Sequence, residues 1–455
     1  MNGSFFIYEE WQFLLLGLMA IIGLTYQVTH KNFLFLTLFC GFVLFSRSFS
    51  HLYVKVVGIP FYITESVLLL TLLSLLIEGL VRGEIKYLKV PLSKQFMVLY
   101  LIGLVSLIRG LYSYGDKTFV LRHAALFYYS IFYFLIPMIF NSMKRIEQLM
   151  RAFFICTLIV SLPSLFGLHY KAFAQFSYYY ISLTVLMSLF YITLVKDNTN
   201  KFLWGLIICL QLSVVITDRV RAAWLGMFAS GIFVFYLLVK NYLSLRLFKR
   251  IAGLTFFGGL LIFLVIALVK PNLVTHLFNE VLSTFLVSAN QEDVESQTSI
   301  KNAQWRLYVW KDIIEETLQK PFLGWGFGKK FVPSTIKALG WGGSWMEADK
   351  GWQDPHNSFL SIFHRTGIVG LLAFLVIMKK FVSRTLKVVK QIQDKKIKTY
   401  IFALLVCIIF ILGTSFFMVV LEGPFLGSFL WICMGLIVSL ENIYRKLPQL
   451  QNAKE

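Results

Sequence analysis

The sequence is poor in charge: Asp, Glu, Lys and Arg make up only 15% of its 455 residues, while 58% are hydrophobic. Soluble domains carry about 25% charged residues, so the composition argues against a soluble fold and favours a membrane protein. The five cysteines all lie in apolar runs and form neither a CxxC pair nor a Cys/His ligand spacing. Neither a zinc site nor a disulfide framework is therefore indicated.

Motifs of soluble nucleotide chemistry are also missing from the sequence. It contains no P-loop, no GxGxxG opening a soluble helix, no HExxH and no DxD-like acidic pair suited to a metal-bound nucleotide sugar. A nucleotide-dependent cytoplasmic enzyme is therefore not expected, and no cofactor or metal is predicted. The N-terminus carries Glu9 and Glu10 instead of the positive region of a cleavable signal peptide, so its first apolar run should stay as a membrane helix.

Apolar runs long enough to cross a bilayer recur along the chain. They lie at about 11–29, 33–49, 60–81, 95–112, 123–140, 149–168, 175–195, 202–218, 222–239, 251–269, 357–378, 400–420 and 424–440. Arg47 interrupts the end of the second run, so the prediction is 12 or 13 spans. The predicted fold is an all-α membrane bundle: residues 1–269 supply ten helices, 270–355 one large loop with short amphipathic helices, 356–445 the last three helices and 446–455 a tail.

The net charge of +20 comes largely from basic residues in alternate short loops. Because cytoplasmic loops of membrane proteins are rich in Lys and Arg, this pattern predicts membrane anchoring and not nucleic-acid binding. The basic loops follow the runs that end near residues 81, 140, 239 and 378. These loops and the C-terminus should lie on the cytoplasmic side. The loop 270–355 then faces outward, and the N-terminus does so if there are 13 spans.

The long outward loop has internal structure. Apolar residues recur at spacings of three and four, between charged residues, which predicts an amphipathic helix that ends before Pro321; its apolar face would comprise Ala303, Leu307, Trp310, Ile314 and Leu318. The Gly- and aromatic-rich segments 324–328 and 340–343 follow. Such segments suit close contact with a membrane surface or with a sugar face.

His356 is the first candidate for chemistry, since it lies where the loop re-enters the membrane in the sequence Asp354-Pro355-His356-Asn357. Histidine can act as a general base near neutral pH, although an interfacial or capping role is the more common one for a lone histidine. Asn357 fits a helix N-cap better than a catalytic group.

Arginines at the outward side are the second candidates. Arg219 and Arg221 lie between two apolar runs joined by almost no polar linker, and paired guanidinium groups suit a phosphate or diphosphate. Arg306 lies on the flank of the predicted loop helix, and Arg122 opens another span. The alternatives are contacts with lipid headgroups, pairing with Asp218, or simple solvation.

The segment 321–328, the Asp354-Pro355-His356-Asn357 motif, the segment 365–372 and the segment 221–226 together resemble the signature of the O-antigen ligase and O-antigen polymerase superfamily. The resemblance covers roughly residues 200–440. It implies an inverting, metal-independent membrane glycosyltransferase in the bacterial inner membrane. The donor would be an undecaprenyl-diphosphate-linked glycan at the outer face, and the acceptor a glycan, a lipid A core or another molecule.

In this resemblance His356 would accept the proton from the attacking hydroxyl. Arg221 and Arg306 would hold the diphosphate, and Arg219 joins them only by proximity. Asp354, Asn357 and Arg122 are supporting candidates. Family members often carry Glu where this chain has Arg365, so no role for an acid is carried over. Ligase and polymerase remain open, and a transporter of lipid-linked sugar is the alternative of another class, against which the lack of internal repeats argues.

Overall fold

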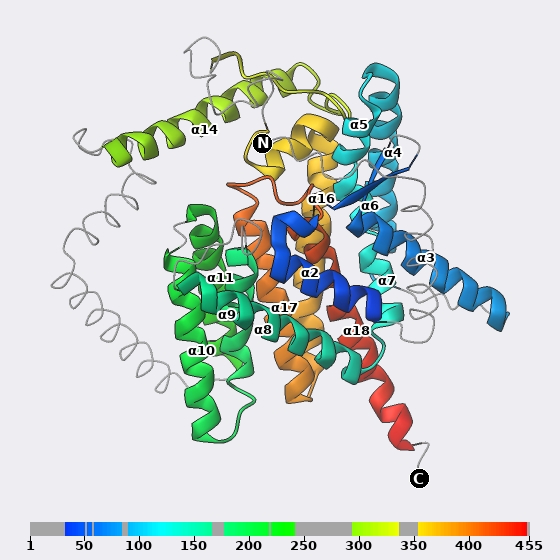
Figure 1. Ribbon diagram of the computed structural model, residues 1–455. Helices are drawn as coiled ribbons and strands as arrows, with labels where there is room; N and C mark the ends of the chain where they lie inside the picture. Colours follow the sequence, from blue (N-terminus) through cyan, green and yellow to red (C-terminus); the bar gives the residue numbers. More distant parts are fainter. Residues whose placement is uncertain are drawn as a thin grey trace, which may run out of the picture.

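The computed structural model describes residues 32–50, 52–56, 59–83, 90–165, 177–217, 220–241, 294–335 and 354–452. These residues form helices joined by short loops, together with one two-stranded hairpin (Figure 1). The predicted spans at 11–29 and 251–269 and the Gly-rich segment 340–343 lie outside the described residues.

The first part of the described chain contains α2 (Phe33–Ser50), the antiparallel strands β1 (Tyr53–Val56) and β2 (Ile59–Tyr62), α3 (Ile63–Arg82) and α4 (Ser93–Ser113). The span predicted at 123–140 is broken: α5 (Lys117–His123) is followed by α6 (Ala125–Tyr129) and α7 (Phe132–Ile139), with a bend of 44° at the break.

The remaining elements follow the predicted runs closely. They are α8 (Met143–Leu165), α9 (Ser177–Tyr191), α10 (Asn198–Thr217), α11 (Arg221–Asn241), α14 (Val294–Leu318), α16 (Ser358–Gln391), α17 (Lys395–Thr414) and α18 (Leu426–Asn452). Within the described ranges, eight helices are long and apolar enough to cross a membrane, or nine if the bent pair is one span. The predicted fold class, an all-α multi-pass membrane protein, is confirmed.

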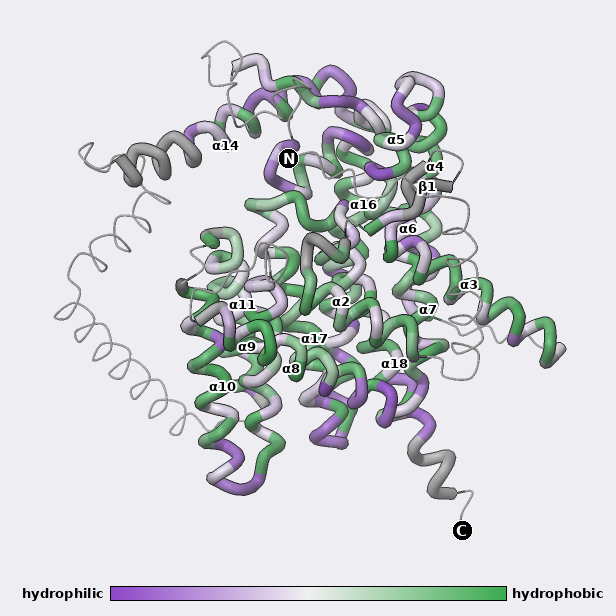
Figure 2. The backbone as a smooth tube through the Cα atoms, viewed as in Figure 1, coloured by the Kyte–Doolittle hydropathy of each residue, from purple (hydrophilic) through white to green (hydrophobic). Residues whose placement is uncertain are grey.

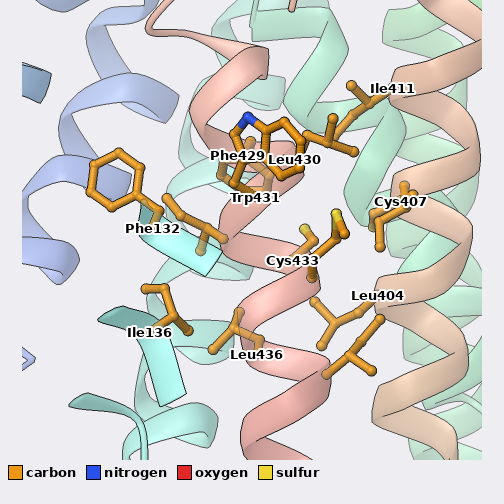
Figure 3. Close-up of a cluster of buried hydrophobic side chains, with 14 of the residues drawn as sticks. Phe132, Ile136, Leu404, Cys407, Ile411, Phe429, Leu430, Trp431, Cys433 and Leu436 are labelled. Atoms are coloured by element: carbon orange, nitrogen blue, oxygen red, sulfur yellow. The ribbon is translucent and has the colours of Figure 1, made fainter. Parts of the chain in front are cut away.

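The core of the bundle lies around α17 and α18, which are buried along most of their lengths. Figure 3 shows side chains of these two helices meeting residues of α7, including Trp431, Cys407 and Phe132, all of which are fully buried. In lipid such helices associate through close packing, because lipid tails are as apolar as the side chains. The peripheral helices α3, α4 and α10 instead expose many large apolar side chains, as lipid-facing helices do.

Polar residues gather at the two ends of the bundle (Figure 2). At one end, Lys396 pairs with Glu147 at 2.8 Å and joins the start of α17 to the start of α8. Arg384 pairs with Glu441 at 2.6 Å and joins the distal parts of α16 and α18. The helix α14 lies at the opposite end (Figure 1). This separation of the basic loops from the loop helix is the arrangement that the charge pattern predicts.

Candidate functional site

The helix α14 packs onto the start of α16 through a small core of its own. Trp305, Val309 and Ile313 are buried there with Phe331, and Leu360 of α16 packs against them. The spacing of four residues places the three α14 side chains on one helical face. This contact fixes α14 above the point where the chain enters the bundle.

The predicted helix in the loop is confirmed. Of its predicted apolar face, Trp310 packs against the small core, but three other residues are exposed. Leu307, Ile314 and Leu318 are 53%, 38% and 60% exposed. The helix carries apolar residues on two opposite faces, and the periodicity alone could not decide between them. Contact with Phe331 and α16 selects the face that carries Trp305.

The helix α16 is broken at Gly367, which adopts φ +66° inside an otherwise helical segment. The segment 321–328 follows the end of α14 and pairs with the backbone that this break leaves open. The N–H groups of Trp325 and Gly326 donate to the carbonyls of His364 and Arg365 at 2.8 and 2.9 Å, and the N–H of Ile368 donates to Pro321 at 2.8 Å. Irregular backbone at membrane depth requires such internal partners.

Close backbone packing requires glycine at two positions of this contact. A Cβ at Gly367 would overlap the carbonyl of Phe322, and a Cβ at Gly324 would lie 2.6 Å from the carbonyl oxygen of His364. Gly324 also has φ +61°, which disfavours any residue with a side chain. The Gly-rich segment therefore serves as a backbone plug against α16.

Two side chains at the end of α4 also bind the backbone of the Gly-rich segment 321–328. The guanidinium of Arg109 in α4 donates to the carbonyls of Leu323 and Gly324 at 3.0 and 2.9 Å. The Tyr114 hydroxyl donates to the carbonyl of Trp325 at 3.0 Å. Helices α4 and α16 and the loop after α14 are thus held as one unit.

His356 lies directly beside this unit, in the turn that begins α16. It adopts φ +47°, in the left-handed region that residues with side chains rarely occupy. Its ring lies edge to face against Trp305, with centroids 5.2 Å apart. Its Nδ1 is buried and makes no hydrogen bond to the residues that the structure describes. A strained residue with an unsatisfied polar atom indicates a functional constraint.

The turn is clamped on both sides of the histidine. The indole N–H of Trp310 donates to the carbonyl of Pro355 at 2.8 Å. The Asn357 side chain caps α16, accepting from the N–H groups of Phe359 and Leu360 at 2.9 and 3.1 Å. These contacts stabilise the strained conformation and fix the direction of the imidazole.

The electrostatic environment keeps the imidazole neutral. Burial, assisted by the positive charge of Arg306 and opposed by the negative charge of Asp354, lowers the pKa of His356 to about 4. A neutral imidazole with an unoccupied ring nitrogen can accept a proton at neutral pH. Arg306, which is half-buried on α14, is the positive charge that contributes to this lowered pKa.

The other candidate residues have different positions. Arg221 is the first residue of α11, but its side chain, like the whole of Arg219, lies outside what the structure describes. Arg122 is exposed on α5. Asp354 is half-exposed next to the histidine turn. The structure thus associates His356 with Arg306 and Asp354, while the predicted convergence with Arg221 stays a prediction.

A buried charge pair behind the histidine turn was not predicted from the sequence. The Arg365 guanidinium donates to Glu422 at 3.0 Å and lies 3.8 Å from the Asp354 carboxylate. Burial raises the pKa of Glu422, although the charge of Arg365 opposes this effect. Glu422 comes from the loop between α17 and α18, more than 50 residues away, so no local motif could reveal the pair.

A second polar cluster ties α14 to α16. The carboxylate of Glu316 lies 3.2 Å from the ring Nε2 of His364 and 3.3 Å from the ammonium of Lys329. Burial opposes the ionisation of Glu316, but His364 and Lys329 outweigh it and lower the pKa of that carboxyl. A small polar pocket runs between the two clusters, lined among others by His364, Arg365 and Asp354. Among the described residues, no three His, Cys, Asp or Glu side chains are grouped to hold a metal ion.

Comparison with known families bears directly on this region. Residues 204–375 match the family model described as O-antigen ligase. The chain carries an O-antigen ligase family domain. That domain includes Arg221, Arg306 and the His356 turn, together with the plug at Gly367. A presumed polysaccharide ligase of Rickettsia conorii is 32% identical to this chain over 108 residues, which is 22% of this chain and 24% of that relative. The match thus spans about a quarter of the relative's length.

Proposed function

We propose that this protein is an inverting, metal-independent glycosyltransferase of the O-antigen ligase type. It transfers a glycan from an undecaprenyl-diphosphate carrier to a hydroxyl of a second glycan, a lipid A core or another acceptor. The chain lies in the bacterial cytoplasmic membrane with α14 and the His356 turn at the outer face and the C-terminus in the cytoplasm. The domain match and the separation of basic loops from α14 support this assignment.

The observation that carries the proposal is the pairing of a neutral histidine with an arginine. The half-buried His356 has a buried Nδ1 that makes no hydrogen bond within the described part of the chain, and the charge of Arg306 lowers its pKa. A base and a cation that acts on it electrostatically match the two needs of glycosyl transfer from a diphosphate: removal of the acceptor proton and stabilisation of the departing anion.

The reaction proceeds as a single displacement. The acceptor oxygen attacks the anomeric carbon while its proton moves to the imidazole of His356. The bond between the anomeric carbon and the diphosphate oxygen breaks, and undecaprenyl diphosphate leaves with the electron pair. Arg306 and Arg221 bind this diphosphate, since guanidinium groups match its oxygens bidentately. Positioning and charge stabilisation account for the rate increase.

The acceptor distinguishes a ligase from a polymerase. The test is turnover of a synthetic undecaprenyl-diphosphate oligosaccharide by the purified protein in lipid nanodiscs, with products identified by mass spectrometry. Transfer to an added lipid A core or glycan acceptor supports the ligase assignment. Elongation of the carrier-linked glycan itself assigns the chain as a polymerase, and intact donor with every acceptor would contradict the proposal.

A further inference from the structure

Arg365 sits at the centre of three segments that meet behind the histidine turn. It is 5% exposed and lies on the first half of α16, before the break at Gly367. Its Nη1 donates to Glu422, and its Nη2 faces Asp354 at 3.8 Å. Asp354 precedes His356 by two residues, so a single guanidinium connects the α17–α18 loop, α16 and the histidine turn.

Ser358 at the start of α16 also joins this helix to the chain that follows α17. Its N–H donates to the carbonyl of Ser415 at 2.9 Å, and its hydroxyl accepts from the N–H groups of Val420 and Leu421 at 3.0 and 3.2 Å. These bonds fix the loop that supplies Glu422. Glu422 therefore holds Arg365 from a rigid position, and Arg365 in turn presents a fixed cation to Asp354.

The charges that face His356 come from two elements. Arg306 lies on α14, and Asp354 lies on the turn itself. Arg365 lies on α16 behind them, and its partner Glu422 is already hydrogen-bonded to it. Asp354 is 47% exposed in its side chain, so it depends on Arg365 to stay against the turn instead of rotating into water.

We infer that Arg365 is a positioning residue, which holds the strained His356 turn in its conformation through Asp354. Glu422 is the buried counter-ion that keeps the Arg365 guanidinium in place. Arg365 touches no substrate. Its effect on transfer passes entirely through Asp354. This inference rests on the proposed function for its catalytic meaning, but the geometry it asserts can be measured without turnover.

The measurement is the rate at which diethyl pyrocarbonate acylates His356 in the full chain at pH 7, followed by mass spectrometry. At this pH the imidazole is neutral in the wild type, because its pKa lies at about 4. The acylation rate therefore reports access to the ring and not its ionisation. The amine of Lys387, which is exposed on the distal part of α16, is also acylated by the reagent and provides the internal control within each sample.

The variants form a cycle: Asp354→Asn, the neutral pair Arg365→Gln with Glu422→Gln, and all three changes together. Replacing both partners of the buried pair avoids a lone buried charge. The inference predicts that Asp354→Asn and the neutral pair each accelerate acylation of His356 about fivefold or more. The combination should add nothing further, and acylation of Lys387 should be unchanged. Asp354→Asn should fold, because the replaced side chain is half-exposed. Acylation of His356 at the wild-type rate in this variant overturns the inference. Additive effects of the changes in the combined variant also overturn it.

Activity provides a second readout. If the wild type transfers glycan, the neutral pair should lower kcat while leaving the KM for the lipid-linked donor within about twofold, because the donor diphosphate is bound elsewhere. A wild type inactive on every acceptor would count against the proposed function alone. An active wild type whose kcat survives the neutral pair would count against the positioning role alone.

Discussion

The backbone N–H of Trp325 donates to the carbonyl of His364 at 2.8 Å, one turn before Gly367 interrupts α16. This bond links the segment that follows the loop helix to the inside of a membrane span. It explains why the loop helix α14 and the membrane helix α16 can hold one site between them. The distance between Arg306 on α14 and His356 on the turn depends on this junction.

Replacing Gly367 by Ala should open the junction. The new Cβ would overlap the carbonyl of Phe322 and would sit at φ +66°. Strain of this kind costs about 1–3 kcal/mol before the steric overlap is added. The melting temperature of the purified protein should fall clearly. Gly231→Ala is the matched control, since a Cβ there meets nothing within 4 Å; equal melting temperatures for the two variants would argue against the plug.

The pH dependence of transfer should reflect the depressed pKa of His356. Transfer requires the neutral imidazole, so the rate falls as pH drops through the pKa, which lies at about 4, and stays level from pH 5.5 to 8. Arg306→Gln removes a charge that lowers this pKa, so its acidic limb should move to higher pH. Asp354→Asn should move the limb to lower pH. The measurement is kcat/KM against pH, and a wild-type midpoint near 6.5 would contradict the buried environment.

Arg306 should matter more for the rate of transfer than for folding. Removing one donor that stabilises charge in a transition state typically costs about 10²–10³ in kcat, and Arg306→Ala should lose activity on this scale at an unchanged melting temperature. The control on the same helix is Lys311→Ala, whose side chain is 65% exposed and pairs only with the exposed Glu315. If both variants kept wild-type kcat, the diphosphate role of Arg306 would be wrong.

Removing only one partner of the buried pair of Arg365 and Glu422 should lower the stability of the protein strongly. Glu422→Ala leaves a 5% exposed guanidinium without its main counter-ion, and such a loss costs about 3–5 kcal/mol. Neutralising both partners together should recover most of this loss. Glu315→Ala removes an exposed partner and should change stability by at most about 0.5 kcal/mol. Thermal or denaturant unfolding in detergent provides the comparison.

The sequence predicted the parts of this molecule that depend on local composition. The apolar runs match the described helices closely, because a lipid environment requires about 20 apolar residues for each span. The loop helix and its end before Pro321 were predicted for the same local reason. His356 and Asn357 were placed correctly at the start of α16, where Asn357 is indeed the cap.

The parts that the sequence did not predict depend on contacts between distant segments. The break at Gly367 looks like ordinary helix in the sequence, and only the loop at 321–328 explains its conformation. The buried face of α14 is selected by Phe331. Glu422 had no local signal in the sequence, since it lies in the loop between α17 and α18 and its partner Arg365 lies on α16.

The central claim is that His356 is the base of a glycosyl transfer from a lipid diphosphate. The most direct test is transfer by wild type and His356→Ala in nanodiscs, with an undecaprenyl-diphosphate-linked oligosaccharide and a lipid A core or glycan acceptor, measuring covalent product and released undecaprenyl diphosphate. Wild type should form both, and His356→Ala should be slower by about 10²–10⁴ at equal melting temperature. Full turnover by His356→Ala, or movement of the glycan across the membrane without any new glycosidic bond, would contradict the claim.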